Sequence, residues 1–367
     1  AGGCVAEGLR RMRAGEVELS PGFDGEYGKI QLLDEAEIEA LSGQVSLFGD
    51  PVPRKKMTAE RAPKKAKSEL AAELAPDLAA SSAIPEKEGV LDGLNAQQRE
   101  AVTATARTVA VVAGPGTGKT KTLVSRIAYL VEGCGVIPAE ITAVTFTNKA
   151  AGEMRERLSK QIGKRAARSM QIGTFHSISL DLLKRNYSSV VLADEYETAD
   201  LARTLIAELS LKLSPRDFLS EVSKRKCGIA SDSSTLTEEA YSLFCSRLQE
   251  SGVLDFDDLL LHALQIAESD EWTDQQKRRF SYLLVDEYQD INGVQAQLIR
   301  AWNKEGKNLF VIGDPDQSIY GFRGSDARCF DQLAELDSGL QTIRLIQNYR
   351  STPEILDCAL SVISCTA

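Results

Sequence analysis

The stretch "VAVVAGPGTGKTKTL" (109–123) constrains the fold of this chain more than any other. An apolar run typical of a buried strand leads into a glycine-rich turn, and Gly-Lys-Thr then opens a helical pattern. At the start of a helix the backbone N–H groups lack intrahelical partners and the helix dipole favours anions. The stretch therefore predicts a phosphate-binding loop from Gly114 to Thr120 inside an α/β domain.

Two side chains of this loop have the chemistry that a nucleoside triphosphate requires. Lys119 is expected to reach the β- and γ-phosphates, and the Thr120 hydroxyl is expected to bind Mg²⁺. Ala113 stands where the pattern GxxxxGK[ST] has its first glycine. The competing interpretation is a glycine-rich turn without a ligand, and the intact strand, turn and helix around Gly-Lys-Thr favour ATP with Mg²⁺.

A pair of acids supplies the second half of a hydrolytic site. In "YLLVDEYQD" (282–290) an apolar strand pattern ends at Asp286 and Glu287. Asp286 is expected to hold Mg²⁺, and Glu287 to orient or deprotonate the water that attacks the γ-phosphate. Most Asp-Glu pairs are solvated surface acids, but this pair follows a strand in the same domain as the phosphate loop.

Short apolar runs alternate with helical patterns beyond Leu91. The strand-like runs are 109–113, 141–146, 283–286 and 309–312, and each ends in a glycine-containing or polar loop. Such alternation predicts a parallel sheet with helices on both faces and ligands at the carboxyl ends of the strands. Residues 187–255 contain helical patterns without a convincing strand, which predicts a helical insertion subdomain.

Composition limits the cellular location and the kinds of ligand expected for the chain. The seven cysteines show no CxxC spacing and the two histidines lie far from them, which argues for reduced thiols, a cytoplasmic location and no zinc site. No apolar run has membrane-spanning length, and the net charge of −10 argues against coating nucleic acid by bulk electrostatics. Residues 51–90 combine prolines, alanines and a basic cluster without any aromatic residue, which is typical of a flexible linker.

The order of motifs along the chain closely resembles the UvrD/Rep/PcrA-type superfamily 1 DNA helicases. The resemblance runs from about Leu94 to the end of the chain and rests on "LNAQQREAV" (94–102), "AGPGTGKT" (113–120), "AVTFTNKAAGEMRERL" (143–158), "IGTFHS" (172–177), "LDFDDLL" (254–260), "LLVDEYQD" (283–290), "VIGDPDQSIYGFRGS" (311–325) and "LIQNYRST" (345–352). It implies a RecA-like P-loop NTPase domain and an ATP-dependent helicase or translocase that moves 3′-to-5′ on single-stranded DNA in repair or replication.

The resemblance also implies roles for further residues at the nucleotide. Gln98 matches the glutamine that reads adenine, and Arg126 and Tyr349 match the pair that sandwiches its ring. Gln317 matches the sensor of the γ-phosphate, and Arg350 matches the arginine that offsets its charge from across a domain cleft. The full nucleotide-binding set is Gln98, Ala113, Gly114, Pro115, Gly116, Thr117, Gly118, Lys119, Thr120, Lys121, Arg126 and Tyr349, and the catalytic set is Lys119, Asp286, Glu287, Gln317 and Arg350.

The same resemblance points to a surface for single-stranded DNA, where aromatic side chains stack on bases whatever the sequence. Core packing competes with this role for Phe146 and Phe175, and a structural histidine is the competing interpretation for His176. Phe322 stands where the family usually has tryptophan. The expected DNA-binding residues are Phe146, Thr147, Asn148, Thr174, Phe175, His176, Tyr320, Phe322 and Arg323.

The motif positions predict a division of the chain into segments. We expect an upstream remnant (1–50), the linker (51–90), a first RecA-like domain in two parts (91–186 and 256–340), the helical insertion (187–255) and the start of a truncated second RecA-like domain (341–367). Within the remnant, "LSPGFDGEYGKIQLL" (19–33) is similar to the tail of PHP-type phosphoesterases, which implies an upstream nuclease-like domain. The alternative, to which we give equal weight, is a glycine-rich turn between two strands of an unknown domain. We expect a chain that ends here not to unwind duplex DNA by itself.

Two other functions fit parts of the sequence. One is a P-loop ATPase that uses hydrolysis for another purpose, which would not need "TFTNKAA" or "SIYGFRG". The other is a DNA- or protein-binding module that has lost turnover, against which the intact Lys119, Asp286 and Glu287 argue. Oligomeric state does not follow from the sequence.

Overall fold

The computed structural model describes residues 18–20, 29–31, 89–229, 236–270, 272–321, 324–326 and 328–364. The chain divides into two compact units, 1–84 and 85–367. In the first unit, strands β1 (Glu18–Ser20) and β2 (Lys29–Gln31) pair antiparallel, with Leu19 opposite Ile30. Residues 21–28 between these strands lie outside the described residues, and both the PHP-type resemblance and its alternative stay predictions. The linker expected at 51–90 lies outside the described residues up to 88.

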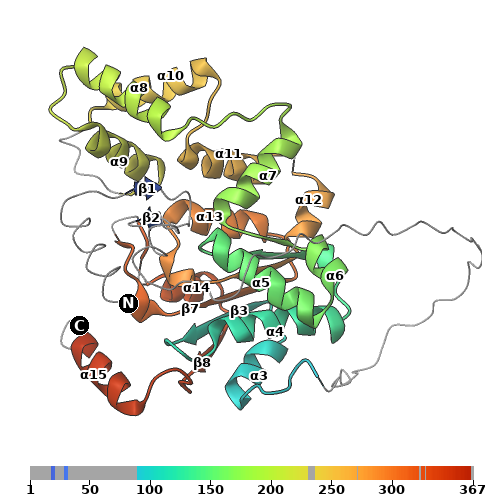
Figure 1. Cartoon of the computed structure of the whole chain (residues 1–367). Coiled ribbons are helices and arrows are strands. Elements are labelled where there is room, and N and C mark those ends of the chain that lie inside the picture. Colours follow the sequence, from blue (N-terminus) through green and yellow to red (C-terminus); the bar gives the residue numbers. More distant parts are fainter. Residues whose placement is uncertain are drawn as a thin grey trace, which may run out of the picture. The chain divides into compact units, whose positions relative to one another are not determined.

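The second unit is built on one six-stranded sheet in the order β5-β4-β6-β7-β3-β8 (Figure 1). All of its strand pairs are parallel, which confirms the predicted α/β fold. Four strands follow the apolar runs of the sequence, whereas β5 and β8 were not expected. The strands are β3 (Thr108–Ala113), β4 (Ile141–Val144), β5 (Gln171–Gly173), β6 (Tyr282–Val285), β7 (Asn308–Gly313) and β8 (Gln341–Leu345).

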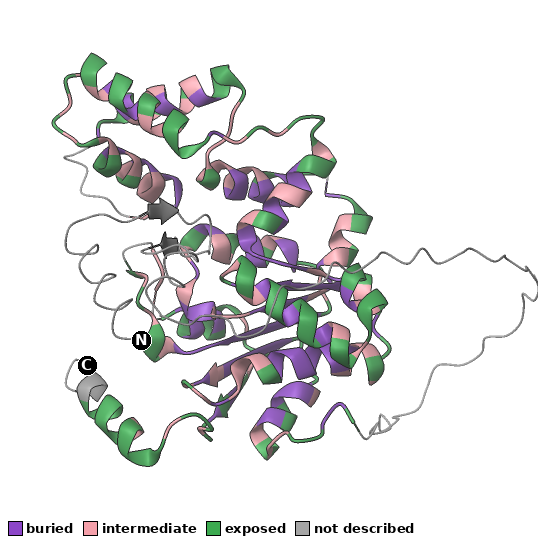
Figure 2. Ribbon diagram, in the orientation of Figure 1, coloured by how far each residue is buried: buried purple, intermediate pink, exposed green. Residues whose placement is uncertain are grey.

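The sheet separates two hydrophobic cores because successive side chains of a strand point to opposite faces. In β7, Phe310 and Ile312 enter one core and Leu309 and Val311 enter the other. Burial is accordingly concentrated along the strands and on the helix faces that cover them (Figure 2). The core on the Phe310 face includes residues of α3 (Ala96–Thr103), α4 (Lys119–Glu132), α5 (Asn148–Gln161) and α6 (Lys164–Ser169), and the opposite core includes residues of α7 (Phe175–Asn186), α11 (Phe256–Glu268), α13 (Gly293–Trp302) and α14 (Cys329–Leu336).

The neighbouring strands β3 and β7 lead their chains to opposite faces. After β3 the chain enters α4 on the Phe310 face, whereas after the neighbouring β7 it enters α14 on the other face. Where adjacent parallel strands diverge in this way, a crevice opens at their carboxyl ends and is the usual ligand site of open α/β sheets. Six of the quoted sequence motifs begin in or directly after β3, β4, β5, β6, β7 and β8 and so reach this edge.

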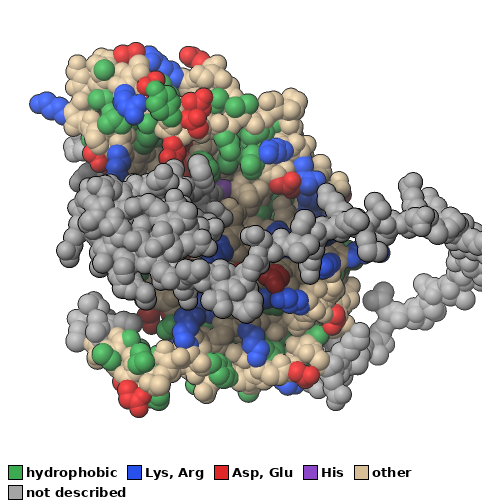
Figure 3. Space-filling model, in the orientation of Figure 1, with side chains coloured by type: hydrophobic (Ala, Val, Ile, Leu, Met, Phe, Trp, Pro, Cys, Tyr) green, Lys and Arg blue, Asp and Glu red, His purple; other side chains and the backbone are tan. Residues whose placement is uncertain are grey.

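Helices α8 (Glu195–Glu208), α9 (Pro215–Lys226) and α10 (Glu238–Ser251) pack around a third hydrophobic cluster of their own. The rings of Phe218 and Phe244 meet at its centre, with centroids 5.7 Å apart. A parallel bridge between Leu192 and Leu254 brings the two ends of this helical segment together. On the face shown in Figure 3, acidic, basic and hydrophobic side chains are interspersed over these helices.

The predicted domain boundaries stay predictions, and β8 bears on one of them. This strand begins at residue 341, where the second RecA-like domain was expected to start, yet it pairs with β3 in the first sheet. The remaining helices are α12 (Asp274–Arg279) and α15 (Pro353–Ser364). Within the described part of the chain, no helix combines the length and the apolar content needed to cross a bilayer.

One buried cation fastens the helical segment to the sheet domain. The Lys226 ammonium, at the end of α9, lies 2.7 Å from an Asp255 carboxylate oxygen and 2.6 Å from one of Asp258 at the start of α11. The Lys226 side chain is only 2% exposed. The two carboxylates and the dehydrated ammonium compensate each other's charge. Removing one partner would leave a buried charge unpaired, which is costly.

Replacing Lys226 with methionine keeps most of the side-chain volume and leaves both carboxylates without their shared cation. We expect Lys226→Met to lower the free energy of unfolding by about 3–5 kcal/mol, measured by urea denaturation. The control is Arg203→Met, whose pair with Asp200 is more than half exposed on both sides and should contribute less than about 1 kcal/mol. Equal losses in the two variants would contradict the role given to Lys226.

Candidate functional site

The loop after β3 has the conformation of an anion-binding turn. Gly116 (φ 72°) and Gly118 (φ 89°) adopt the left-handed region that favours glycine. Within the turn, the Thr117 hydroxyl donates to the Gly114 carbonyl over 2.7 Å. Helix α4 then begins at Lys119, and no side chain caps its first turn. The first N–H groups of α4 therefore have no side-chain acceptor and suit a phosphate.

Both left-handed glycines also lie where no larger residue fits. A Cβ on Gly118 would stand 2.7 Å from the Gln98 side-chain nitrogen, and a Cβ on Gly116 would stand 2.7 Å from the Cβ of Arg350. Real Cβ atoms do not approach other atoms this closely. The loop is thus packed between Gln98 on one side and the segment around Arg350 on the other.

Gln98 is held at the loop by two hydrogen bonds. Its amide donates to the Thr117 carbonyl over 2.8 Å, and its oxygen accepts from the Asn95 backbone N–H in the capping box that starts α3. The side chain is buried. The structure therefore brings Gln98 to the phosphate loop, and its reading of adenine stays a prediction.

The chain after β8 contacts the same loop from the other side. The Tyr349 N–H donates to the Gly116 carbonyl over 2.8 Å, and the Asn348 side chain donates to the Pro115 carbonyl. The Tyr349 ring is exposed, and its hydroxyl accepts a hydrogen bond from Asn95. Tyr349 and Arg350 thus lie beside the loop, as expected of residues that contact a nucleotide.

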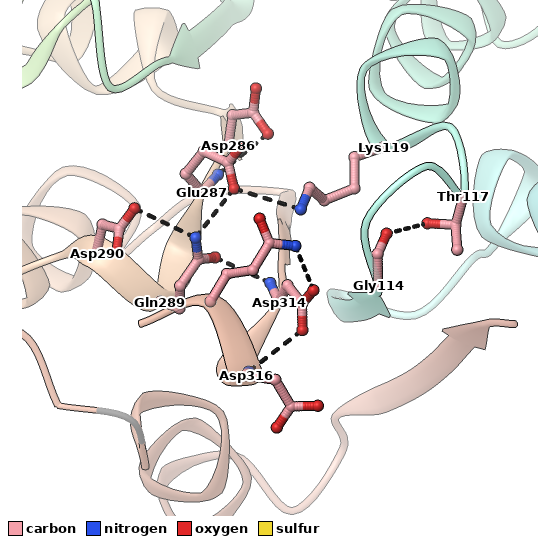
Figure 4. Close-up of polar contacts among 10 residues, drawn as sticks. Gly114, Thr117, Lys119, Asp286, Glu287, Gln289, Asp290, Asp314 and Asp316 are labelled. Atoms are coloured by element: carbon pink, nitrogen blue, oxygen red, sulfur yellow. Dashed lines mark hydrogen bonds and ion pairs between the residues drawn. The ribbon is translucent and has the colours of Figure 1, made fainter. Parts of the chain in front are cut away.

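The acidic pair lies opposite Lys119 at the end of β6 (Figure 4). The Lys119 ammonium is 3.6 Å from a Glu287 carboxylate oxygen. Glu287 has a left-handed backbone (φ 47°), unusual for a residue with a side chain, and its N–H donates to Asp286. Such strain at a strand end is typical of residues that function there. Lys119, Asp286 and Glu287 are therefore brought together as predicted.

Burial alters the titration of this edge. Burial, and then the charge of Glu287, raise the pKa of Asp286 to about 7. Burial and the same glutamate raise the pKa of Asp290 to about 6. A dehydrated carboxylate of this kind is unfavourable without a nearby cation. A bound cation would relieve that penalty.

The oxygen donors at this edge suit Mg²⁺. Thr120, the second residue of α4, and Asp286 supply a hydroxyl and a carboxylate, which are hard ligands. Mg²⁺ in nucleotide sites usually keeps several waters and binds one or two protein groups together with phosphate oxygens. In the described part of the chain, no three His, Cys, Asp or Glu side chains gather as a metal cluster, and a magnesium site of this type requires none.

The loop after β7 folds back on the same edge. The buried Asp314 carboxylate accepts from the Gln317 side chain over 2.5 Å and from the Asp316 N–H over 3.2 Å. These bonds hold the short turn of residues 315–317 beside the acidic pair (Figure 4). The structure therefore places Gln317 at the predicted site, while its contact with a γ-phosphate stays a prediction.

The role expected for Arg126 is wrong. This side chain is buried and donates to the Val102 carbonyl over 2.7 Å and to Asn308 at the start of β7 over 3.2 Å. Burial lowers its pKa to about 10. Asn308 lies at the amino ends of the strands, so Arg126 is on the opposite edge from Tyr349 and cannot form a sandwich with it. Lys121, also in the predicted set, is exposed near Gln98 and donates to the Gly93 carbonyl.

Seven of the nine predicted DNA-binding residues fall into three groups. Phe146, after β4, and Tyr320, after β7, stack with their ring centroids 5.1 Å apart, and Phe146 is 41% exposed. Thr147, Asn148 and Thr174 lie at helix starts: Thr147 caps α5, Asn148 is its first residue, and Thr174 caps α7. Phe322 and Arg323 lie outside the described residues.

Phe175 corrects one of these expectations, because it packs in the core and not on the surface. It is buried, and its ring stacks on Trp302 with centroids 6.0 Å apart. The neighbouring His176 is half-buried and meets the exposed ring of Phe256 edge to face at 5.6 Å. His176 and Phe256 therefore remain at the surface while Phe175 does not.

The sequence reasoning missed four polar residues of the site. Asn95 and Asn348 fasten Tyr349 and the phosphate loop, and Asp314 and Gln289 organise the acidic edge. The capping pattern Asn95-x-x-Gln98 was a usable signal for the first. Gln289 and Asp314 stand within quoted motifs next to apolar strands. The sequence reasoning gave no role to a neutral amide or to a further acid at these positions.

Comparison with known proteins gives a consistent result. The family pattern described as the UvrD/REP helicase N-terminal domain matches residues 94–215 and 193–336. The chain is 36% identical over 297 residues to the ATP-dependent DNA helicase PcrA of Leuconostoc citreum, covering 76% of this chain and 40% of the relative. It is 36% identical over 292 residues to the helicase Rep of Escherichia coli, covering 74% of this chain and 43% of the relative. It is 38% identical over 307 residues to the helicase UvrD1 of Mycobacterium tuberculosis, covering 75% of this chain and 40% of the relative. The chain thus spans about two fifths of the length of these relatives.

Removing the buried charge of Asp286 should change how stability depends on pH. An acid whose pKa rises from about 3.9 unfolded to about 7 folded destabilises the fold as pH rises through that window. We therefore expect nucleotide-free Asp286→Asn to match the wild type near pH 4 and to exceed its stability by on the order of 1–4 kcal/mol at pH 8. Urea midpoints measured across this range test it, and a difference that is constant with pH would contradict it.

Proposed function

The chain belongs to the UvrD/REP helicase family, and from this premise we propose that it forms the ATP-binding motor part of an ATP-dependent DNA helicase or translocase. Its relatives carry that activity in their names, but the chain spans only about two fifths of them. The activity of the whole protein, its movement on single-stranded DNA and its direction, 3′-to-5′, are therefore parts of the proposal.

The observation that carries the proposal is the meeting of Lys119 and Glu287 across the phosphate loop, 3.6 Å apart. In the structure the ammonium and the carboxylate pair with each other. A γ-phosphate between them would take over the ammonium and leave Glu287 facing the position of an attacking water. This arrangement supports ATP hydrolysis more than simple nucleotide storage, because storage needs no carboxylate at that position.

Each group then has a defined task at the nucleotide. The N–H groups of the loop and of α4 bind and orient the phosphates, and Lys119 offsets their charge. Thr120 and Asp286 would hold Mg²⁺, which supplies charge neutralisation of the phosphate oxygens when bound. Glu287 orients the water and accepts its proton. Gln98, Tyr349 and Arg350 are proposed to contact the adenine ring and the phosphates.

The stacked pair Phe146 and Tyr320 supports the nucleic-acid part of the proposal. Two aromatic rings from separate loops lie at the carboxyl edge of the sheet, and one of them is well exposed. Such rings stack with any base, so a strand of DNA can be held without sequence preference. A P-loop ATPase with another task would have no use for this pair. We propose Thr147, Asn148 and His176 as neighbours of the strand.

The loop between β7 and α14 joins the two ligands. Its first residues, Asp314 to Gln317, lie at the acidic edge, and Tyr320 follows within the stack. A change at the nucleotide therefore has a path of only a few residues to the base-stacking surface. We propose that this loop couples hydrolysis to the grip on DNA. A cytoplasmic setting and an upstream nuclease-like domain stay predictions.

Changing Glu287 to glutamine should separate nucleotide binding from hydrolysis. Glutamine keeps the size of the side chain but cannot accept the proton of water, so turnover should fall by about 10²–10⁴-fold with ATP affinity retained. Steady-state ATPase rates and binding of a fluorescent ATP analogue, measured on the full-length protein, report the two effects. The control is Glu305→Gln, in an exposed pair with Lys277, which should leave turnover unchanged. A variant with normal turnover would refute the assignment.

Removing the exposed aromatic ring at residue 146 should weaken binding of single-stranded DNA. We expect Phe146→Ala to lose about 1–3 kcal/mol of affinity for an oligothymidylate, together with most of the stimulation of ATPase by DNA. Fluorescence anisotropy and the ratio of turnover with and without DNA measure these quantities. Tyr196→Ala, which removes an exposed ring from α8, is the matched control. Unchanged affinity in Phe146→Ala would show that its ring serves packing only.

A further inference from the structure

Gln289 lies between the acidic pair and the loop after β7, and the catalytic, nucleotide-binding, metal-binding and DNA-binding roles assigned above do not include it (Figure 4). Its amide nitrogen donates to a Glu287 carboxylate oxygen over 3.0 Å and to Asp290 over 3.2 Å. Its amide oxygen accepts from the Asp314 backbone N–H over 2.9 Å. The residue is 2% exposed, so these bonds are made away from water.

The end of β7 is shaped to receive this side chain. A Cβ on Gly313 would lie 2.4 Å from the amide oxygen of Gln289 and 2.9 Å from the backbone nitrogen of Tyr288. The backbone of Gly313 does not need a positive φ. Close approach is therefore the reason for glycine here, and any side chain at this position would push Gln289 away from Asp314.

Through Gln289 the ends of two neighbouring strands become one hydrogen-bonded unit. The Ser318 hydroxyl donates to the Gln289 backbone carbonyl over 3.2 Å, and Asp314 in turn holds the Gln317 side chain. A path of hydrogen bonds thus runs from Glu287 through Gln289 and Asp314 to Gln317. It connects the carboxylate expected to activate water with the residue expected at the γ-phosphate.

We propose that Gln289 is a positioning residue that fixes the Glu287 carboxylate for hydrolysis and ties its position to the turn of residues 314–318. This inference rests on the proposed ATPase function. A primary amide suits the task because it donates to carboxylates and accepts from a backbone N–H at once, and it stays neutral at every pH. A carboxylate could not donate here, and an ammonium or guanidinium could not accept.

The fixed position matters because Glu287 has few other constraints. Its ion pair with Lys119 is long, at 3.6 Å, and a phosphate would compete for that ammonium. The bond from Gln289 is then the contact that keeps the carboxylate in place during hydrolysis. A shift of about 1 Å in a reacting group can cost on the order of 10²-fold in rate.

Two substitutions in the full-length protein separate the donor function of the Gln289 amide from its acceptor function. Gln289→Glu keeps an acceptor for Asp314 but loses the donor to Glu287, whereas Gln289→Met loses both at similar volume. We expect each to lower kcat of ATP hydrolysis by on the order of 10- to 100-fold while the Kd of a fluorescent ATP analogue changes little. Gln276→Glu is the matched control, because at the start of α12 it likewise keeps an acceptor, for the Thr273 N–H, and loses a donor, to the Asn186 side chain.

A double-mutant cycle distinguishes positioning from general packing. If Gln289 acts through Glu287, adding Gln289→Met to Glu287→Gln should lower kcat no further. An additional loss in the double variant, or an unchanged kcat in Gln289→Glu, would overturn the inference. Should Gln289→Met fail to fold, the nearly isosteric Gln289→Glu in the same cycle decides it. A wild-type protein without turnover would overturn the proposed function itself, and this inference with it.

Discussion

Two carboxylates of like charge, Asp286 and Glu287, are held side by side at the end of a buried strand, and the site is arranged around that constraint. The energetic cost of holding them together appears in the titration of Asp286. Burial and the charge of the neighbouring Glu287 raise the pKa of Asp286 to about 7. Lys119 and Gln289 offset part of this cost on the Glu287 side with an ion pair and a hydrogen bond. The parallel sheet makes the arrangement possible, because it brings the loops after β3, β6 and β7 to one edge while two hydrophobic cores fix the strands.

Much of this was predictable from sequence, and the failures have physical causes. Long apolar runs gave β3, β4, β6 and β7, but β5 has three residues and β8 alternates exposed with buried positions, so neither produces a run. Phe146 and Phe175 both stand directly after a threonine that follows a strand, and only the structure separates them. Phe146 precedes a helix cap and stays outside, whereas Phe175 follows the cap Thr174 and is turned inward onto Trp302. The family resemblance itself is confirmed by the matched pattern.

Arg126 illustrates the limit of transferring a role by motif alone. It lies on α4, whose first residues are proposed to bind phosphate, but it is two turns further along and faces inward toward Asn308. The rotation of a helix decides which of its residues reach a ligand, and that rotation depends on packing against the sheet. Gln98, by contrast, does lie beside the phosphate loop, because a capping box fixes its direction at the start of α3.

The segment after β8 contacts the phosphate loop and also orients its peptide groups. Its donors, the Tyr349 N–H and the Asn348 amide, occupy the carbonyl oxygens of Gly116 and Pro115. In a trans peptide the N–H points opposite to the C=O, so fastening these oxygens outward turns the corresponding N–H groups away from the segment. The segment thereby orients two peptides of the loop: their carbonyl ends face residues 348 and 349. Of their N–H groups, that of Thr117 donates to the Gly114 carbonyl over 3.4 Å, and that of Gly116 points away from the segment. The proposed affinity of this loop for phosphate therefore depends in part on residues more than two hundred positions downstream of it.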